Sequence, residues 1–145
     1  MRGQQIAAGV DVGYNPYSMY GELFIIDATP IGGHTLAEIE TAINEQLELV
    51  KNEKVSEAEL DRIKAQVLAG KVYEKDSVFY QAMQMGTLET VGLGWQRMDE
   101  YGDKIKQVTP EQIQQVAKKY LVKDQRTVAV LDPLPLETKQ ASNKQ

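Results

Sequence analysis

At Pro30-Ile-Gly-Gly-His-Thr-Leu-Ala-Glu38 the sequence changes from the period of a β-strand to the period of an α-helix. Before this stretch, residues 6–14 alternate along the chain in the way that is typical of a half-buried strand. Residues 20–28 predict a second strand, and the turn signal Asn15-Pro16 between the two favours an antiparallel hairpin. After the stretch, apolar residues recur every three or four positions, which indicates helices that each bury one face.

Three of the expected helices begin with a capping box, in which two side chains satisfy each other's free backbone amides. The boxes pair Thr35 with Glu38, Ser56 with Glu59, and Thr109 with Gln112. Two further helices are predicted over residues 77–92, which end at glycines, and over residues 95–106. The pattern therefore predicts a run of five helices after the two strands.

The β-branched run Arg126-Thr-Val-Ala-Val-Leu131 predicts a last strand. Because an isolated strand has no ladder partner, we expect it to return to the sheet of the first two strands. This order indicates an α+β fold, an antiparallel or mixed sheet with helices packed on one face. We expect one domain over residues 1–132, followed by a polar, loose tail over residues 133–145.

The composition narrows the possible chemistry. The chain has 145 residues, a formal net charge of −5, no cysteine and one histidine, His34. A structural zinc site usually takes about four Cys or His ligands, and a catalytic one usually takes about three protein ligands that include at least one or two histidines, so we expect no metal site, no cofactor and no catalytic residue within this chain. A pI of about 4.9 disfavours nucleic acid as a partner. No apolar run approaches the roughly 20 residues needed to cross a bilayer, so we expect no membrane partner.

His34 is the first candidate for a functional residue. It lies four positions before Glu38, a spacing that places two side chains on one helix face. Thr35 is the expected cap, however, so His34 falls just outside the helix in a Gly-Gly-His loop. A solvated or packing role is favoured over a metal-binding or catalytic one, and an independent hydrolase built on His34 is the weaker hypothesis.

Tyrosines gather around the predicted turn at Tyr14, Tyr17 and Tyr20. They predict an aromatic loop that could bind a peptide or a partner, because tyrosine offers a large contact area at a low entropy cost. The alternative interpretation is structural, with Tyr14 and Tyr20 ending two strands and Tyr17 covering a loop. We take Tyr14 and Tyr17 as candidate substrate-binding residues.

Four stretches stand out when they are taken together. They are Arg2-Gly-Gln-Gln-Ile-Ala-Ala-Gly-Val10, Gly21-Glu-Leu-Phe-Ile-Ile-Asp-Ala28, Val55-Ser-Glu-Ala-Glu-Leu-Asp-Arg-Ile-Lys64, and Val108-Thr-Pro-Glu-Gln-Ile-Gln-Gln-Val-Ala-Lys-Lys-Tyr-Leu121 with the following Thr127-Val-Ala-Val-Leu-Asp-Pro133. They span most of the chain before the tail, and they resemble the second half-domain of the insulinase/pitrilysin-like zinc peptidases, the H-x-x-E-H group. The resemblance implies the fold of that half-domain.

In that family the first half-domain holds zinc through two histidines and a distal glutamate, and a glutamate of the motif activates the water. One histidine cannot form H-x-x-E-H, so the resemblance implies that this chain is the non-catalytic half of a zinc metalloendopeptidase. Family members often bind substrate through an Arg and a Tyr seven residues apart. Arg2 falls on the Arg position, whereas Gly9 stands at the Tyr position. The resemblance therefore implies Arg2 as a substrate-binding residue without its usual partner.

The resemblance also implies partners, namely a zinc-bearing half-domain of the same or a partner chain, and a peptide substrate. It implies the bacterial periplasm as the location of the parent protein. The chain begins where a helix of the half-domain would be ending, so we expect an N-terminally truncated fold with uncovered apolar surface. Such a chain is expected to form homo-oligomers or to exchange elements. The alternative is a scaffold or assembly subunit of the same fold with no proteolytic role.

Overall fold

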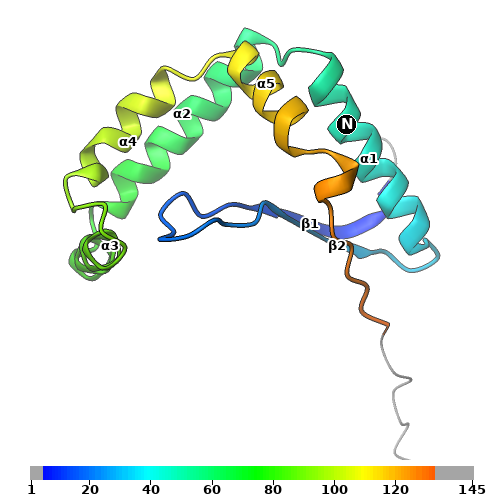
Figure 1. The fold of residues 1–145 in the computed structure, drawn as a ribbon, viewed down its shortest axis with the longest axis horizontal. Coiled ribbons are helices and arrows are strands. Elements are labelled where there is room, and N and C mark those ends of the chain that lie inside the picture. Colours follow the sequence, from blue (N-terminus) through cyan, green and yellow to red (C-terminus); the bar gives the residue numbers. More distant parts are fainter. Residues whose placement is uncertain (1–4, 133–145) are drawn as a thin grey trace, which may run out of the picture.

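The computed structural model describes residues 5–132, and their fold is α+β (Figure 1). A two-stranded sheet is followed by five helices, which form an arch above it. The elements are β1 (Ala7–Gly13), β2 (Ile25–Pro30), α1 (Leu36–Asn52), α2 (Glu57–Glu74), α3 (Val78–Thr90), α4 (Arg97–Lys106), α5 (Pro110–Tyr120) and the 3-10 turn η1 (Lys123–Gln125). All the helices lie on one side of the hairpin or at its end, as the sequence predicts.

The arch has two limbs. Helices α1 and α5 pack together in one limb, and α2 packs on α4 in the other, with α3 at the foot (Figure 1). A Cβ atom added at Gly102 of α4 would lie 3.5 Å from Leu68 Cδ2 of α2, an ordinary contact distance that places Leu68 against this turn of α4. At the apex, Lys54 Nζ lies 2.7 Å from Glu111 Oε1.

The helix starts follow the capping signals. The capping boxes of Thr35 with Glu38 and of Thr109 with Gln112 are both formed. At α2, the Ser56 hydroxyl accepts from the Glu59 amide, but only this half of the predicted box is present. Helix α3 begins at an additional cap, Ser77, and two glycines with positive φ, Gly92 and Gly94, follow its end.

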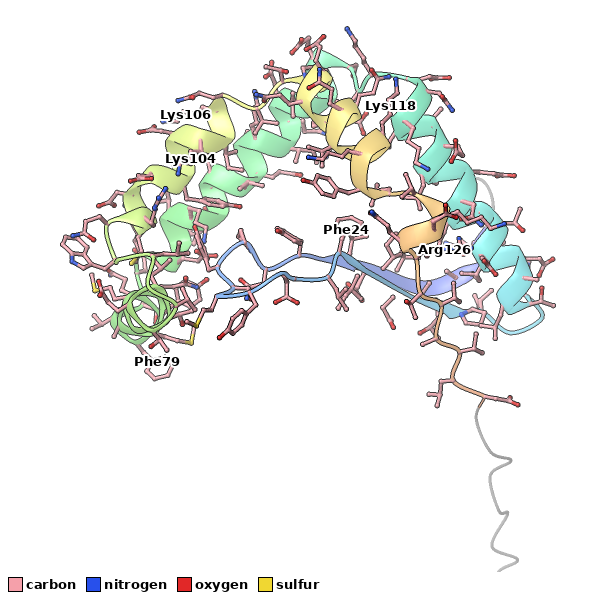
Figure 2. The ribbon with its side chains drawn as sticks, viewed as in Figure 1. Phe24, Phe79, Lys104, Lys106, Lys118 and Arg126 are labelled. Atoms are coloured by element: carbon pink, nitrogen blue, oxygen red, sulfur yellow. The ribbon has the colours of Figure 1, made fainter. Side chains whose placement is uncertain are left out.

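The hairpin is antiparallel, and its register separates two faces. Val10 lies opposite Ala28 and Val12 opposite Ile26, so one face of the hairpin is apolar. The other face carries Asp11 directly opposite Asp27. Figure 2 shows Phe24, two residues before Ile26, pointing up from the hairpin towards α5, so the apolar face is the one beneath the arch.

Two strand predictions need correction. The second strand begins at Ile25 and not at Tyr20, because the preceding loop is taken up by an Asn15 turn and by contacts of Tyr17 with the helices. The prediction of a last strand over Arg126–Leu131 is wrong: these residues pair with no strand among residues 5–132.

The reason lies at the start of that segment. Arg126 is bound to α1, where its Nη2 lies 2.8 Å from Glu40 Oε1 and its Nη1 donates to Asn44 Oδ1 (Figure 2). From this anchor the chain runs steeply away from the hairpin and not along it (Figure 1). Two segments that are not aligned cannot form a ladder, so a β-branched composition alone produces no strand here.

The buried core is small. The buried hydrophobic side chains of the described part are Ile39, Leu60, Leu88 and Ala117, and only Leu88 is large and completely covered. The predicted apolar stripes of the helices are therefore mostly half-buried. Much of the apolar surface of this fold has nothing packed on it.

Candidate functional site

The predicted binding residues Tyr14 and Tyr17 have different surroundings. Arg2 lies outside the described residues, as does the predicted tail after Asp132. Tyr14 follows the last residue of β1 and is exposed, whereas Tyr17 turns inward and packs against the opposite limb of the arch. Their roles in binding substrate stay predictions, and Tyr14 is the one of the two that a ligand could reach freely.

Tyr17 belongs to a cluster that joins the tip of the hairpin to the helices. Its ring lies 6.3 Å from the ring of Tyr101 on α4, at 57° between the planes. Lys71 of α2 places its Nζ 5.1 Å from the centre of the Tyr101 ring and 2.6 Å from Glu74 Oε2. Nearby, Gln84 donates to the hydroxyl of Tyr80 at 2.9 Å. The cluster thus combines aromatic stacking, a cation over a ring and an ion pair.

In this cluster the pKa values of Tyr17 and Lys71 are both raised, so both side chains hold their protons more tightly than usual. Burial raises the pKa of Tyr17, and the charge of Lys71 only partly opposes this. Burial acts to lower the pKa of Lys71, but the hydrogen bond and charge of Glu74 outweigh it and leave that pKa raised. The cavity beside these side chains has a volume of about 40 Å³, which is room for little more than water. The cluster is therefore better suited to holding the hairpin than to binding a substrate.

His34 lies at a wider opening. A shallow groove of about 520 Å³ runs between the start of β1 and α1, and His34, Glu38 and Glu45 are among its lining residues. His34 Nδ1 lies 3.4 Å from Glu38 Oε2. The same oxygen accepts the backbone N–H of Thr35 at 2.7 Å, and this bond is the main reason why the pKa of Glu38 is lowered. Glu38 thus serves the capping box first, as the sequence predicts, and His34 is its neighbour.

Within residues 5–132 no three His, Cys, Asp or Glu side chains come together as metal ligands would. None of the described helices is both long and apolar enough to cross a membrane. The remaining candidate on the described part is an exposed apolar surface.

The most unusual surface lies beneath the arch, and we call it the inner face. Figure 2 shows Lys118 of α5 pointing up, away from the hairpin. Val116 and Tyr120 lie two positions before and after Lys118, roughly 160° around the helix, so they point down towards the hairpin. Apolar side chains of α5 and of the hairpin thus face each other. The inner face consists of Val10, Val12, Phe24, Val116 and Tyr120, which are 47% to 61% exposed.

The total surface shows how much is left open. The chain exposes 12243 Å², whereas a compact protein of 16.2 kDa exposes about 7,500 Å². An allowance of about 2,700 Å² for the 17 residues outside 5–132 still leaves an excess of roughly 2,000 Å². A standard protein interface takes about 800 Å² from each partner, so the open area exceeds what one interface covers.

Sequence reasoning missed the partners of Tyr17 and the anchor of Arg126. The spacing of Lys71 and Glu74, three apart on a helix, indicates their ion pair, but no local signal links either to Tyr17. Likewise, Arg126 and Glu40 are 86 residues apart in the chain. Contacts over such separations depend on how whole elements pack.

No known family model matches the chain, and no curated protein is significantly similar to it.

Proposed function

We propose that the chain is a non-catalytic domain of a zinc-peptidase-like protein, which packs on a zinc-bearing half-domain and helps to enclose a peptide substrate. The zinc and the general base belong to that partner half, in the same chain or in another. In this role the chain contributes a wall and an interface and takes no part in bond cleavage.

The observation that carries this proposal is the open inner face with the excess of surface. Val10, Val12 and Phe24 on the hairpin and Val116 and Tyr120 on α5 each keep about half of their surface exposed. Exposed apolar surface of this extent is rare on a protein that functions as a monomer and is typical of obligate interfaces. A partner domain on the inner face would bury part of the area that the chain leaves open.

The resemblance adds the kind of partner. Its most specific stretches, Val55–Lys64 and Val108–Leu121, fall on the start of α2 and on α5, and each includes the side-chain cap of its helix. The second half-domain in that family closes over the substrate. This supports a zinc-bearing half as the partner over an unrelated one.

The test is to combine the chain with an H-x-x-E-H half-domain encoded in the same genome, loaded with zinc. We expect a one-to-one complex in sedimentation velocity and faster hydrolysis of a quenched fluorescent peptide than with the zinc half alone. Val116→Lys should weaken the complex by about tenfold or more, since it places a charge on the inner face. Val72→Lys is the matched control, because Val72 is equally exposed on the other limb.

The alternative, an assembly subunit without proteolytic role, makes a different prediction. It expects a complex that depends on Val116 but leaves the rate of peptide hydrolysis unchanged. If the zinc half neither binds the chain nor changes its activity in the presence of the chain, the proposal is wrong.

A further inference from the structure

We propose that this chain forms a two-fold dimer in which residues Arg126–Asp132 of each copy add a strand to the free edge of β1 in the other. This interface uses the backbone edge of β1 and adjoins the inner face at Val10 and Val12, and it does not rest on the proposed function. The occupant is a second copy because the required strand is a segment of this same sequence.

The donated segment is described, extended and unpaired. Val128 and Val130 are 54% and 60% exposed, and Leu131 is 88% exposed. The run Thr127–Leu131 carries no charge and has the β-branched alternation of a strand. Because Arg126 is held on α1 by Glu40 and Asn44, the start of the segment is fixed while the rest projects from the body.

Its own hairpin is not aligned with the segment. The segment leaves the end of α5 and η1 at a steep angle to β1 and β2 (Figure 1). To pair within the same chain it would have to turn, and the Arg126 anchor on α1 opposes that turn. A second copy can instead be placed with its hairpin along the projecting segment.

The backbone shows which edge can accept it. Ile31 donates its N–H to the carbonyl of Ile6 at 3.0 Å, and amides along a strand alternate in direction. The amides of Ile26 and Ala28 therefore face the outer edge of β2, where Pro30 has no N–H to offer. Since Asp11 lies opposite Asp27, whose amide faces β1, the amides of Val10 and Val12 point away from β2.

Beyond the register irregularity between Ala7 and Gly9, the outward amides of Val10 and Val12 form an edge of β1 that pairs with no strand among residues 5–132. A strand added there brings Val128 and Val130 beside Val10 and Val12 and extends the apolar face of a two-stranded sheet that is marginal by itself. Two such exchanges are related by a two-fold axis and close the assembly, leaving no further edge of the same kind. The excess of open surface, roughly 2,000 Å², exceeds the about 800 Å² that each copy would contribute to a standard interface.

The experiment is sedimentation velocity on the full chain from low-micromolar to near-millimolar concentration. We expect a monomer–dimer equilibrium with no larger species. Val130→Lys should raise the dissociation constant by about tenfold or more, because a charge on an exchanged strand blocks edge pairing. Val72→Lys, at 65% exposure against 60% for Val130, should leave it unchanged.

Hydrogen exchange adds a readout that a general loss of solubility would not move. The amides of Val10 and Val12 should become protected as the concentration rises, and those of Ile26 and Ala28 should not. A monomer at every concentration would overturn the proposal. A dimer that Val130→Lys leaves intact, or that Val72→Lys weakens equally, would also overturn it, because the contact would then lie on another face or be nonspecific.

Discussion

The helical arch and the β-hairpin with its C-terminal segment are built on different kinds of information. Helices α1, α2, α3 and α5 each begin at a Ser or Thr whose side chain accepts an amide three residues on. The sheet has only β1 and β2 among the described residues, and the segment after Arg126 joins neither. Helices thus form where their own residues direct them, whereas strands form only where a partner is in place.

The difference extends to burial. The arch contains all four buried hydrophobic side chains, while most apolar residues of the hairpin and its loop are exposed. The hairpin is held at its two ends, by α1 near Pro30 and by Tyr17 at the tip. Stability should therefore reside mainly in the arch, and the hairpin should be where partners add to it.

The sharpest test of this division is truncation of matched leucines. Leu88→Ala in α3 removes the one large side chain with no exposed area, and we expect it to lower the free energy of unfolding by about 2–5 kcal/mol. Leu23→Ala in the hairpin loop, where the side chain is 72% exposed, should cost less than about 0.5 kcal/mol. Urea unfolding followed by circular dichroism measures both, and equal losses would show that the hairpin shares the core.

The helices could be predicted from sequence because their signals are local. The box of Thr109 and Gln112 with Pro110 between them is complete within four residues, and α5 begins where it indicates. The segment Arg126–Leu131, where the sequence predicts a strand, has equally clear β-propensity. Whether it pairs depends on where α5 and the Arg126 anchor direct the chain. No property of those six residues contains that information.

The candidate site follows the same rule. Thr35 as the cap, and His34 as a residue outside the helix, are readable from the sequence and are found in the structure. The inner face is not readable, because Phe24 and Val116 look like ordinary apolar positions of a strand and a helix. Only the arrangement of the arch and the hairpin shows that they stay 47% and 56% exposed.

The connection between the two regions can be broken at the tip of the hairpin. Tyr17→Ala removes the contact with Tyr101 and should lower the free energy of unfolding by about 1–2 kcal/mol, from the aromatic pair and the lost burial. Tyr20→Ala, in the same loop but exposed, should have an effect within about 0.5 kcal/mol. If the two variants lose equal stability in urea unfolding, the contact of Tyr17 with Tyr101 does not connect the hairpin to the arch.

A cap within the arch tests whether local signals matter as much as they indicate. Thr109→Ala removes the acceptor of the Gln112 amide and should cost about 1 kcal/mol. Thr90→Ala is the control, because its hydroxyl only bonds back to Gly86 O within α3. Thermal unfolding should show the loss for Thr109 alone, and an equal loss for Thr90 would mean that helix interiors and not caps carry the stability.

The smallest expected effect is on the dependence of stability on alkaline pH. The pKa of Tyr17 is raised above its ordinary 10.0 by burial, and that of Lys71 is raised above 10.5 because Glu74 outweighs burial. The folded chain therefore holds these protons more tightly than the unfolded chain does. Their contribution is complete below pH about 10 and is lost as the pH rises through the folded-state values.

Tyr17→Phe separates this effect from packing, since it keeps the ring and removes the phenol. Urea midpoints on either side of pH about 10 should show a smaller alkaline loss for Tyr17→Phe than for the unmodified chain. Tyr20→Phe, at an exposed position in the same loop, should reproduce the loss of the unmodified chain. An alkaline loss that Tyr17→Phe leaves unchanged would place its source outside the Tyr17 phenol, and the tip would then hold the hairpin by ring contact alone.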